Sequence, residues 1–494
     1  MPDLLRRAPR CPRLVASGLS IGLCLLLVAC GGGSSTISPA DRGGGAATAG
    51  GSQAQAPNTG QAAQPTAGQG GQASQAASGD KIKLTYFNAR GAEAVERALV
   101  SRYMQEHPNV EIDYLASTAM PGPSDTDAIA NLVFNIQSGN VVDIAKIETT
   151  RTPMDLMAAK AAQDLSKINN DAVQARLGDL LNTNYVQIKG GVYALPYEYD
   201  PFGYIYNATM WKEAGLNPDN PPKTWDDLRQ AATTLKAKFQ NTWPICHPLN
   251  NLSKIQPYVW GAGGTFWDRD VLPTKSDVTN PGALAAYGFL REWSQKGWLN
   301  TDEINTTTQV QFMISRQCAG MDLSSDLALQ LRANDPNTDW RVTPIPPMDA
   351  NHKPYNFAGG SSLMVPSTSA HPKEALDFIL WLTDQQAQRL KWGLDQGLQV
   401  SAGDLAAEAT PANKKVAGDS TLTSDPKWSG VIVNVETRPS GVSPIYSQAY
   451  QLLANAQERI ARTQADPQTE LQSAQDQIQK LIDDNKVKMP DLYT

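Results

Sequence analysis

Hydrophobic residues in the first part of the chain follow two periods, which predict strands alternating with helices. Residues 82–87 (IKLTYF) form an apolar run, residues 110–114 alternate between apolar and polar, and residues 141–147 are again largely apolar, so each is expected to be a strand. The residues at helical spacing between these strands are Val95, Leu99 and Tyr103, and then Ile129, Leu132, Val133 and Ile136. This order predicts a parallel sheet with helices on both faces.

A second set of elements is expected after Gly190-Gly191. Thr224 and Asp227 have the spacing of a capping box, which predicts the start of a helix. Extended segments are expected at residues 192–196, 202–206, 318–321, 341–345 and 361–365. Helices near the C-terminus are indicated by the apolar faces Ala375, Ile379 and Leu382; Tyr446, Tyr450 and Leu453; and Leu471, Ala474, Ile478 and Leu481. Residues 81–494 are too many for one ordinary core, so two domains are expected.

The first 80 residues have a different composition from the rest. Four arginines precede residue 14, and an apolar stretch over residues 14–29 fits the central region of a secretory signal but is short for a membrane-spanning helix. It ends Leu27-Val28-Ala29-Cys30, which resembles the lipobox of bacterial lipoproteins. We therefore expect residues 1–29 to be a cleaved signal and Cys30 to carry a lipid. An uncleaved anchor helix is the alternative, and both interpretations put the remainder outside the cytoplasm.

Residues 30–80 are expected to form a flexible linker. After Cys30 they consist mainly of Gly, Ala, Gln, Ser, Thr and Pro, without an aromatic residue. Such a segment cannot bury enough apolar surface to offset the entropy lost on ordering. The predicted protein is thus tethered to the outer face of the cell membrane through its lipid.

Charge and cysteine usage narrow the possible partners. The formal net charge is −7, and the chain has no basic run, which argues against nucleic acid as a partner. Cys11 and Cys24 would leave with the signal, so only Cys246 and Cys318 remain in the folded part. Outside the cytoplasm this pair is expected to form a disulfide, with two separate thiols as the alternative.

The folded part of the sequence lacks known catalytic motifs. The sequence contains no GxxxxGK[ST] or HExxH, and its one GxSxG, at residues 18–22, lies within the predicted signal. Its four histidines are far apart, and each is followed by a proline one or two positions later, as in loops. No metal site and no cofactor are therefore expected. Glu198 and Asp200 are two residues apart in an extended stretch and could serve as a glycosidase pair. One cleft carboxylate beside one solvated carboxylate is the preferred interpretation.

One long stretch resembles a known family. Residues 191–228 read GVYALPYEYDPFGYIYNATMWKEAGLNPDNPPKTWDDL. Tyr206-Asn207, Ala214-Gly215-Leu216 and residues 222–228 match, in order and spacing, the substrate-binding proteins of bacterial ABC importers, particularly the sugar-binding family that includes maltose-binding protein. Shorter matches, such as residues 372–382 (PKEALDFILWL), extend the resemblance over nearly all of residues 81–494.

The resemblance implies an α/β fold of the type II periplasmic-binding-protein class, with a mostly parallel, helix-flanked sheet in each of two hinged lobes. Lobe one would take residues 81–196 and 357–398, and lobe two residues 197–356 and 399–494. Cys246 and Cys318 would then share lobe two, which favours their pairing. The implied partners are a solute and an ABC permease with its cytoplasmic ATPase, and a monomer is expected.

The ligand is expected between the lobes, beyond the carboxyl ends of the strands. A sugar offers apolar C–H faces and many hydroxyls, so its site needs aromatic platforms together with charged and amide side chains. The candidate residues at strand ends, at the crossing strand and at positions where the family has contacts are Asn88, Arg90, Glu148, Tyr197, Asp200, Asn251, Trp260, Trp267, Asp322, Ser324, Gly360, Ser361 and Tyr446. Trp267 is preferred over Trp260 as the stacking ring, and the alternative for both is the core of lobe two.

These features together predict the lipid-anchored receptor of an ABC importer, which binds a carbohydrate reversibly and does no chemistry. Three alternatives stay open: a receptor of the same fold for a peptide or polyamine, an extracellular carbohydrate-active enzyme, and a partner that hands its ligand to a receptor kinase. Arg90 adds the hypothesis of an acidic sugar.

Overall fold

A computed structural model describes residues 81–89, 93–119, 128–300, 302–305, 308–400, 410–423 and 435–494. The predicted signal, the lipid site at Cys30, the linker up to residue 80 and the candidate Arg90 lie outside these residues. Within the described ranges, no helix has both the length and the apolar character that crossing a membrane requires.

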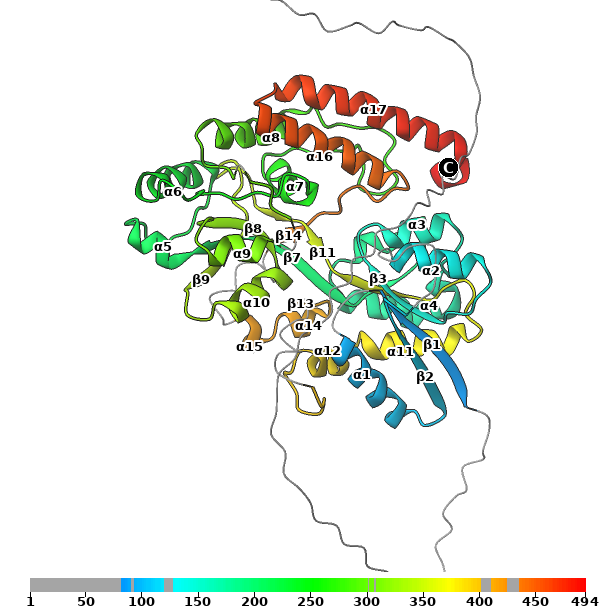
Figure 1. Ribbon diagram of the computed structural model, residues 1–494. Helices are drawn as coiled ribbons and strands as arrows, with labels where there is room; N and C mark the ends of the chain where they lie inside the picture. The colour runs from blue at the N-terminus through cyan, green and yellow to red at the C-terminus, as the bar shows by residue number, and fades with distance from the viewer. Residues whose placement is uncertain are drawn as a thin grey trace, which may run out of the picture. The chain divides into compact units, whose positions relative to one another are not determined.

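Lobe one is built on a five-stranded sheet in the order β2-β1-β3-β12-β6. Strands β1, β2 and β3 are parallel, as the sequence predicts, whereas β12 runs antiparallel to β3 and β6. The bounds of these strands are β1 Ile82–Asn88, β2 Val110–Ala116, β3 Ile144–Glu148, β6 Leu195–Pro196 and β12 Ser361–Met364. The helices of this lobe are α1 Glu93–Glu106, α2 Ala128–Gln137, α3 Thr152–Ala158, α4 Leu165–Asp179, α11 Pro372–Leu382 and α12 Gln385–Lys391 (Figure 1).

Strand β3 begins three residues later than the apolar run suggests, and Asp143 is the reason. Its carboxylate accepts hydrogen bonds from the backbone N–H of Thr85 at 2.9 Å, the hydroxyl of Ser369 at 2.7 Å and the backbone N–H of Ala370 at 3.1 Å. A buried carboxylate needs such partners. Asp143 therefore holds the start of the strand, away from the end where ligands of this fold class bind.

The long strand β7 (Glu198–Asn207) passes from one lobe to the other (Figure 1). Its neighbour Tyr197 and its residue Tyr199 pack in the core of lobe one, whereas Phe202, Tyr204 and Tyr206 pack in the core of lobe two. All its partners run antiparallel to it: β8 Gly320–Ser324, β9 Trp340–Thr343, β11 Ala358–Gly359 and β13 Thr410–Pro411. Among the described residues of lobe two, parallel pairing consists of the short pair β10–β14 and of single bridges, such as Cys246 with Met321.

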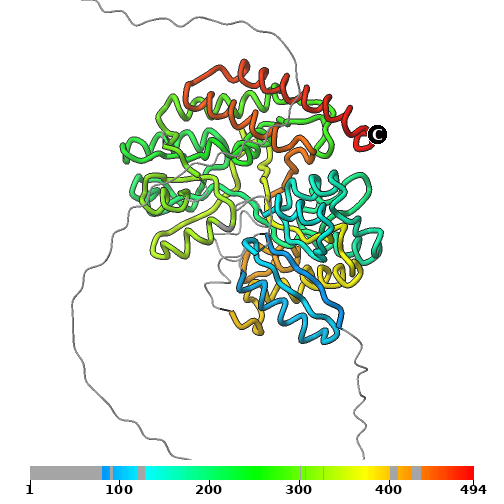
Figure 2. The backbone as a smooth tube through the Cα atoms, turned by 45° about the vertical axis from the view of Figure 1, so that its right-hand side comes forward, coloured from blue at the N-terminus to red at the C-terminus, as the bar shows by residue number. Residues whose placement is uncertain are grey.

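Helices surround β7 in lobe two. Thr224 and Asp227 form the predicted capping box at the start of α6, with Asp227 N donating to Thr224 Oγ1 at 3.3 Å. The helices are α5 Ala208–Glu213, α6 Trp225–Lys238, α7 Leu252–Trp260, α8 Pro281–Gln295, α9 Gln309–Ile314, α10 Ser325–Asn334, α16 Tyr446–Thr463 and α17 Pro467–Lys488. Figures 1 and 2 both show α16 and α17 side by side with α8, and apolar residues of all three belong to one core.

Short elements complete the two lobes and the segments between them. They are the 3-10 turn η1 Thr183–Tyr185, the strands β4 Gln187–Ile188, β5 Gly191–Val192, β10 Tyr355–Asn356 and β14 Glu436–Thr437, and the helices α14 Lys414–Ala417, α15 Ser420–Thr423 and α18 Pro490–Tyr493. β10 pairs with β14 beside the crossing strands. Residue Ala412, which follows β13, packs in the core of lobe one.

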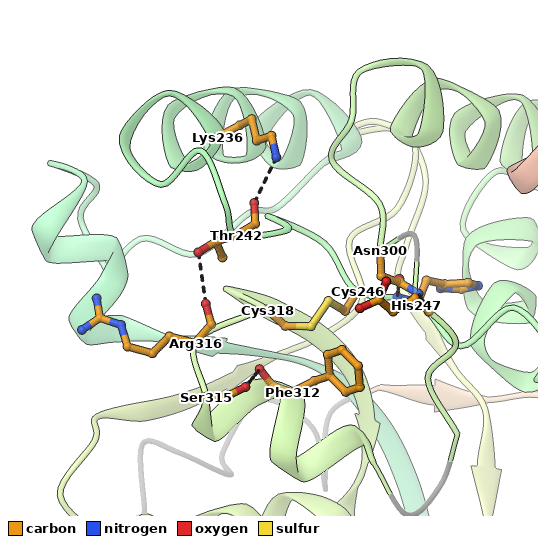
Figure 3. The surroundings of a disulfide bond; sticks show 10 residues. Lys236, Thr242, Cys246, His247, Asn300, Phe312, Ser315, Arg316 and Cys318 are labelled. Atoms are coloured by element: carbon orange, nitrogen blue, oxygen red, sulfur yellow. Dashed lines mark hydrogen bonds between the residues drawn. A yellow bond between two sulfur atoms is a disulfide. The ribbon is translucent and has the colours of Figure 1, made fainter.

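A disulfide joins Cys246 and Cys318 in lobe two (Figure 3). Both sulfur-bearing residues are fully buried in an apolar cluster with Met321. The next residue, His247, lies in an irregular segment as expected, but its side chain is fully buried, and Nδ1 lies 3.3 Å from Asp322 Oδ2. The prediction that His247 lies in a loop is therefore correct, but its side chain is buried inside lobe two and bound to Asp322.

Candidate functional site

A cavity of about 530 Å³ lies between the two lobes. Three parts of the molecule form its walls: the loop after β3 in lobe one, the crossing segments near β7 and β11, and the N-terminal ends of α7 and α16 in lobe two. The lining residues are Glu148, Thr150, Arg151, Asp200, Phe202, Asn251, Ser253, Phe357, Gly359, Gly360, Tyr446, Ser447, Tyr450 and Gln451. Its volume is in the range typical of small-molecule sites, about 300–1,000 Å³.

The lobe-one wall is organised by Glu148, the last residue of β3. Its carboxylate accepts hydrogen bonds from the backbone N–H of Thr150 at 2.8 Å and of Arg151 at 3.1 Å, and from the Thr150 hydroxyl. Arg151 Nη1 in turn donates to Ser447 Oγ of α16 at 3.2 Å, so it links the lobes across the cavity. Arg151 is not among the residues predicted from the sequence to contact the ligand, although its position three residues after the end of a strand is a usable signal.

The wall at the crossing strands combines a carboxylate with two rings. Asp200 and Phe202 are two residues apart on β7 and so lie on the same face. Ser325 Oγ donates to Asp200 Oδ1 at 2.6 Å. Phe202 meets Phe357 edge to face, with ring centroids 5.0 Å apart. The cavity wall thus offers a charged acceptor next to an apolar surface.

Gly360 brings the backbone close to the crossing strand. Its φ is +119°, and a Cβ there would overlap the carbonyl oxygen of Glu198. Only glycine accommodates both conditions without strain. The Gly360 carbonyl accepts a hydrogen bond from Thr149 N at 3.1 Å, which connects this turn to the loop after β3.

The lobe-two wall is held by hydrogen bonds between α7 and α16. Asn251 caps α7 by accepting from Ser253 N at 3.1 Å, and Tyr450 Oη donates to the same Asn251 oxygen at 2.8 Å. Tyr446, the first residue of α16, has its ring centroid 5.7 Å from that of Tyr450. Burial raises the pKa of both tyrosines, so their phenols are neutral at physiological pH and can donate hydrogen bonds.

Five candidate residues from the sequence therefore share this cavity, and seven others do not line it. Those that share it are Glu148, Asp200, Asn251, Gly360 and Tyr446. Those that do not are Asn88, Tyr197, Trp260, Trp267, Asp322, Ser324 and Ser361. Lining residues that were not predicted from the sequence as ligand contacts include Thr150, Arg151, Phe202, Phe357, Tyr450 and Gln451.

The two tryptophans pack in the core of lobe two, the alternative considered for them. Trp260 is 3% exposed and Trp267 is 6% exposed. The Trp267 indole lies against Gly441, where a side chain would overlap it. The rings that line the cavity are instead Phe202, Phe357, Tyr446 and Tyr450.

The remaining candidates outside the lining are engaged within the lobes. Asn88 Nδ2 donates to Tyr114 Oη at 2.8 Å in lobe one. Asp322 is fully buried in lobe two, where it accepts from Tyr258 Oη at 3.1 Å and its carbonyl accepts from Lys254 Nζ at 2.6 Å. Ser324 is the last residue of β8, is buried, and pairs with Phe202 in the β7–β8 ladder.

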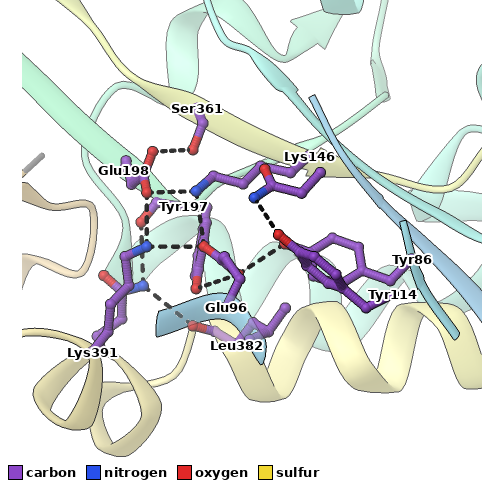
Figure 4. Close-up of polar contacts among 11 residues, drawn as sticks. Tyr86, Glu96, Tyr114, Lys146, Tyr197, Glu198, Ser361, Leu382 and Lys391 are labelled. Carbon is purple, nitrogen blue, oxygen red and sulfur yellow. Dashed lines mark hydrogen bonds and ion pairs between the residues drawn. The ribbon is translucent and has the colours of Figure 1, made fainter. Parts of the chain in front are cut away.

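Tyr197 and Ser361 contact a buried cluster of charged side chains in lobe one (Figure 4). We call this cluster the ionic quartet, and its members are Glu96, Lys146, Glu198 and Lys391. Lys146 Nζ lies 2.8 Å from Glu96 and 2.7 Å from Glu198, and Lys391 Nζ lies 3.1 Å and 2.7 Å from the same two oxygens.

Neighbouring hydroxyls complete the bonding of the ionic quartet. Ser361 Oγ donates to Glu198 at 2.6 Å, and Tyr197 Oη donates to Glu96 at 3.3 Å (Figure 4). Both lysines lie over the Tyr197 ring, with Nζ 5.1 Å and 4.3 Å from its centroid. Two positive and two negative charges balance, which makes burial tolerable. Tyr197 and Ser361 thus hold charged groups of the protein itself.

The described residues include no group of three or more His, Cys, Asp or Glu side chains arranged to hold a metal ion.

Two α/β lobes, a strand that crosses between them and a cavity lined by both are the features of an extracytoplasmic solute-binding protein. The chain belongs to the family of bacterial extracellular solute-binding proteins, whose model matches residues 88–389. The two-lobed periplasmic-binding-protein fold predicted from the sequence is confirmed. The prediction of a mostly parallel sheet in each lobe is wrong for lobe two, where every strand of the sheet around β7 runs antiparallel to it.

Individual relatives are distant but cover much of the chain. The multiple sugar-binding protein of Streptococcus mutans serotype c is 24% identical over 347 residues, which are 64% of this chain and 74% of the relative. The sn-glycerol-3-phosphate-binding periplasmic protein UgpB of Escherichia coli K12 is 27% identical over 280 residues, 54% of this chain and 62% of the relative.

Solved structures share the fold. The sugar-binding protein MalE of Xanthomonas citri superposes with a TM-score of 0.68 at 16% identity and covers 83% of this chain and 99% of its own. A solute-binding protein of Thermotoga lettingae, bound to α-D-tagatose, superposes with a TM-score of 0.64 at 19% identity and covers 81% and 100%.

Proposed function

We propose that the protein is the receptor of an ABC importer and binds a carbohydrate reversibly in the cavity between its lobes. The main support for this proposal is the set of side chains that line the cavity. The rings of Phe202, Phe357, Tyr446 and Tyr450 line it together with the carboxylates of Glu148 and Asp200 and the guanidinium of Arg151. Rings suit the apolar C–H faces of a sugar, and charged groups make strong hydrogen bonds to its hydroxyls.

Ligand binding would stabilise the arrangement in which both lobes contact it. Since the cavity takes residues from each lobe, a ligand gains contacts in the closed form that an open form cannot offer. The closed form is the one that docks on the permease. Anchoring through a lipid on Cys30 would keep the receptor near that permease.

The enzyme alternative is disfavoured by the position of Glu198. A glycosidase needs two carboxyl groups facing one substrate. Asp200 lines the cavity, whereas Glu198 is 5% exposed and bound to Lys146, Lys391 and Ser361 inside lobe one. The other carboxylate that lines the cavity, Glu148, accepts hydrogen bonds from Thr150 and Arg151. We therefore propose that the protein performs no reaction on its ligand.

A phosphorylated polyol is a second candidate ligand. Arg151 offers a guanidinium at the cavity, and guanidinium groups bind phosphate well. A relative that carries the name of an sn-glycerol-3-phosphate-binding protein adds to this candidate. An acidic cavity poor in rings would favour a polyamine or peptide, whereas this cavity combines four rings with the cation of Arg151 beside its two carboxylates.

Thermal shift measurements on the purified protein test both candidates. The panel contains mono- and oligosaccharides, sn-glycerol-3-phosphate, polyamines and short peptides. A true ligand at a hundred times its dissociation constant adds about 2.7 kcal/mol to the free energy of unfolding.

Variants connect any such ligand to the cavity. Asp200→Asn removes a charged acceptor and is expected to weaken binding at least about tenfold. The matched control is Asp226→Asn on α6, whose side chain is 77% exposed and lies outside the cavity lining. Stabilisation by polyamines or peptides but by no saccharide would overturn the proposal, and so would equal effects of the two variants.

A further inference from the structure

A second cavity, of about 500 Å³, lies on lobe one between α2 and α3. We call it the α2–α3 groove. Ile129, Val133 and Phe134 form its apolar wall on α2, and Gln137, Thr152 and Asp155 add polar groups. Figure 1 shows α2 and α3 as neighbours in this lobe.

The ring of Phe134 is unusual for its exposure. Among the described residues, the large hydrophobic side chains classed as exposed are Phe134 at 49%, Val141 at 50% and Val487 at 82%, so Phe134 is the aromatic member of this set. Positions 130, 133, 134 and 137 share one helix face by their spacing, which turns the ring toward the groove. An exposed ring at the edge of a groove offers a flat surface on which the C–H face of a sugar can stack.

Arg151 connects the α2–α3 groove with the cavity between the lobes. Its side chain lines both spaces. The two volumes are nearly equal, about 530 and 500 Å³, so a ligand occupying both would be about twice the size of one held between the lobes alone. A guanidinium at the junction can donate to hydroxyls on either side of it, because its five N–H groups point in several directions.

We propose that the α2–α3 groove is a second subsite for the same carbohydrate, and that the natural ligand is therefore an oligosaccharide that extends out of the interlobe cavity past Arg151. This inference rests on the proposed function. The distal units would stack their C–H faces on Phe134. Their hydroxyls would meet Gln137, Thr152 and Asp155, a ring-and-acceptor combination like that of the first cavity.

Titration calorimetry with chain-length series tests the subsite. The probes are gluco-, manno- and xylo-oligosaccharides of one to seven units, titrated into the full protein. In the series that binds, affinity is expected to rise with each unit beyond those held between the lobes, until the groove is filled. Phe134→Ala is expected to lower the affinity for the longer oligosaccharides about three- to tenfold. The affinity for the shortest oligosaccharide that binds should stay unchanged.

Val487→Ala serves as the control, since it truncates an exposed apolar side chain on α17 outside both cavities and should leave every affinity unchanged. Affinity that stays constant with length, or a Phe134→Ala effect equal for short and long members, would overturn the subsite and leave the proposed function standing. Failure of every series at every length would remove both. A loss of uptake in Phe134→Ala with unchanged affinities would assign the groove to permease docking and also overturn the subsite.

Discussion

Lys391 and Glu198 form an ion pair inside lobe one, with Nζ 2.7 Å from Oε1, although 193 residues separate them in the chain. Glu198 is the first residue of the crossing strand β7, and Lys391 is the last residue of α12. The pair therefore fastens the strand that leads into lobe two to a helix of lobe one.

Breaking the pair on one side is expected to destabilise the protein strongly. Lys391→Met leaves Glu96 and Glu198 to share Lys146, with one uncompensated buried charge. Such a change costs about 3–5 kcal/mol in the free energy of unfolding. In the double variant Glu198→Gln/Lys391→Met, the opposite charges of Glu96 and Lys146 still balance. This variant should therefore lose less free energy of unfolding than the two single variants lose together. Urea denaturation of the four proteins measures this coupling.

A surface pair provides the comparison for this cycle. Lys480 and Asp484 lie 2.8 Å apart on α17, with side chains 76% and 49% exposed. Their cycle is expected to show no measurable coupling, because solvent screens exposed pairs. If the losses of free energy of unfolding in the two single variants of the buried pair add up to the loss in the double variant, the ionic quartet does not act as a unit.

Acid should weaken the same cluster. Burial alone would raise the pKa of Glu96, but Lys146 and Lys391 outweigh it, and the pKa lies below the ordinary value of 4.5. A carboxyl with a lowered pKa in the folded state contributes stability above its unfolded pKa and loses it as pH falls through the folded pKa. The free energy of unfolding is therefore expected to decrease below about pH 4.5.

Glu96→Gln isolates this contribution from that of other carboxylates. The stability difference between the wild type and this variant should be full near neutral pH and shrink as the pH falls below about 4.5. Denaturation curves at a series of pH values measure it. A difference that stays constant down to pH 2 would show that Glu96 does not titrate in this range.

Much of the fold was predictable because its signals are local. Strands β1 and β2 have clear apolar patterns, and the Thr224–Asp227 capping box marks the start of α6. Helix α7 was not predicted because all nine of its residues are buried, so no polar face produces a helical period, and Pro257 lies inside it. Burial on every side depends on neighbours that are distant in the sequence.

The site was predictable only in part, for the same reason. Glu148 and Tyr446 lie at an element's end, and such positions can be read from a strand pattern or from the start of a helix. Whether Trp267 faces a ligand or the core depends on packing against Gly441, 174 residues away in the chain. Arg151 resembles any solvated arginine until the fold brings it to Ser447.

Gly360 offers a test of the turn at the cavity. Gly360→Ala places a side chain at φ +119° and against the Glu198 carbonyl, so a loss of about 1–3 kcal/mol or more is expected. Gly288→Ala is the matched control, because nothing lies within 4 Å of its added Cβ and the residue is inside α8. That variant should gain up to about 1 kcal/mol. Equal stability of the two variants, by thermal denaturation, would contradict the close approach.

The last helix, α18, connects the lobes through a small apolar cluster. Leu492 and Tyr493 pack against this cluster, and the backbone carbonyl of Asp491 accepts a hydrogen bond from Lys189 of lobe one. The cluster takes residues from both lobes: Met154, Tyr185 and Ile188 from lobe one, and Leu272 and Val442 from lobe two. Contacts that exist only while the lobes are together favour the closed arrangement.

Truncation after Met489 should therefore shift the protein toward an open form. It removes the apolar contacts of Leu492 and Tyr493, and we expect the apparent dissociation constant for ligand to rise about three- to tenfold. Small-angle X-ray scattering of the unliganded protein should give a larger radius of gyration for the truncated chain. Val487→Ala, an exposed change in the preceding helix, should alter neither quantity. If the truncated chain keeps both the radius of gyration and the affinity, α18 packs on lobe one without influencing closure, and the balance between open and closed forms is set at the crossing strands instead.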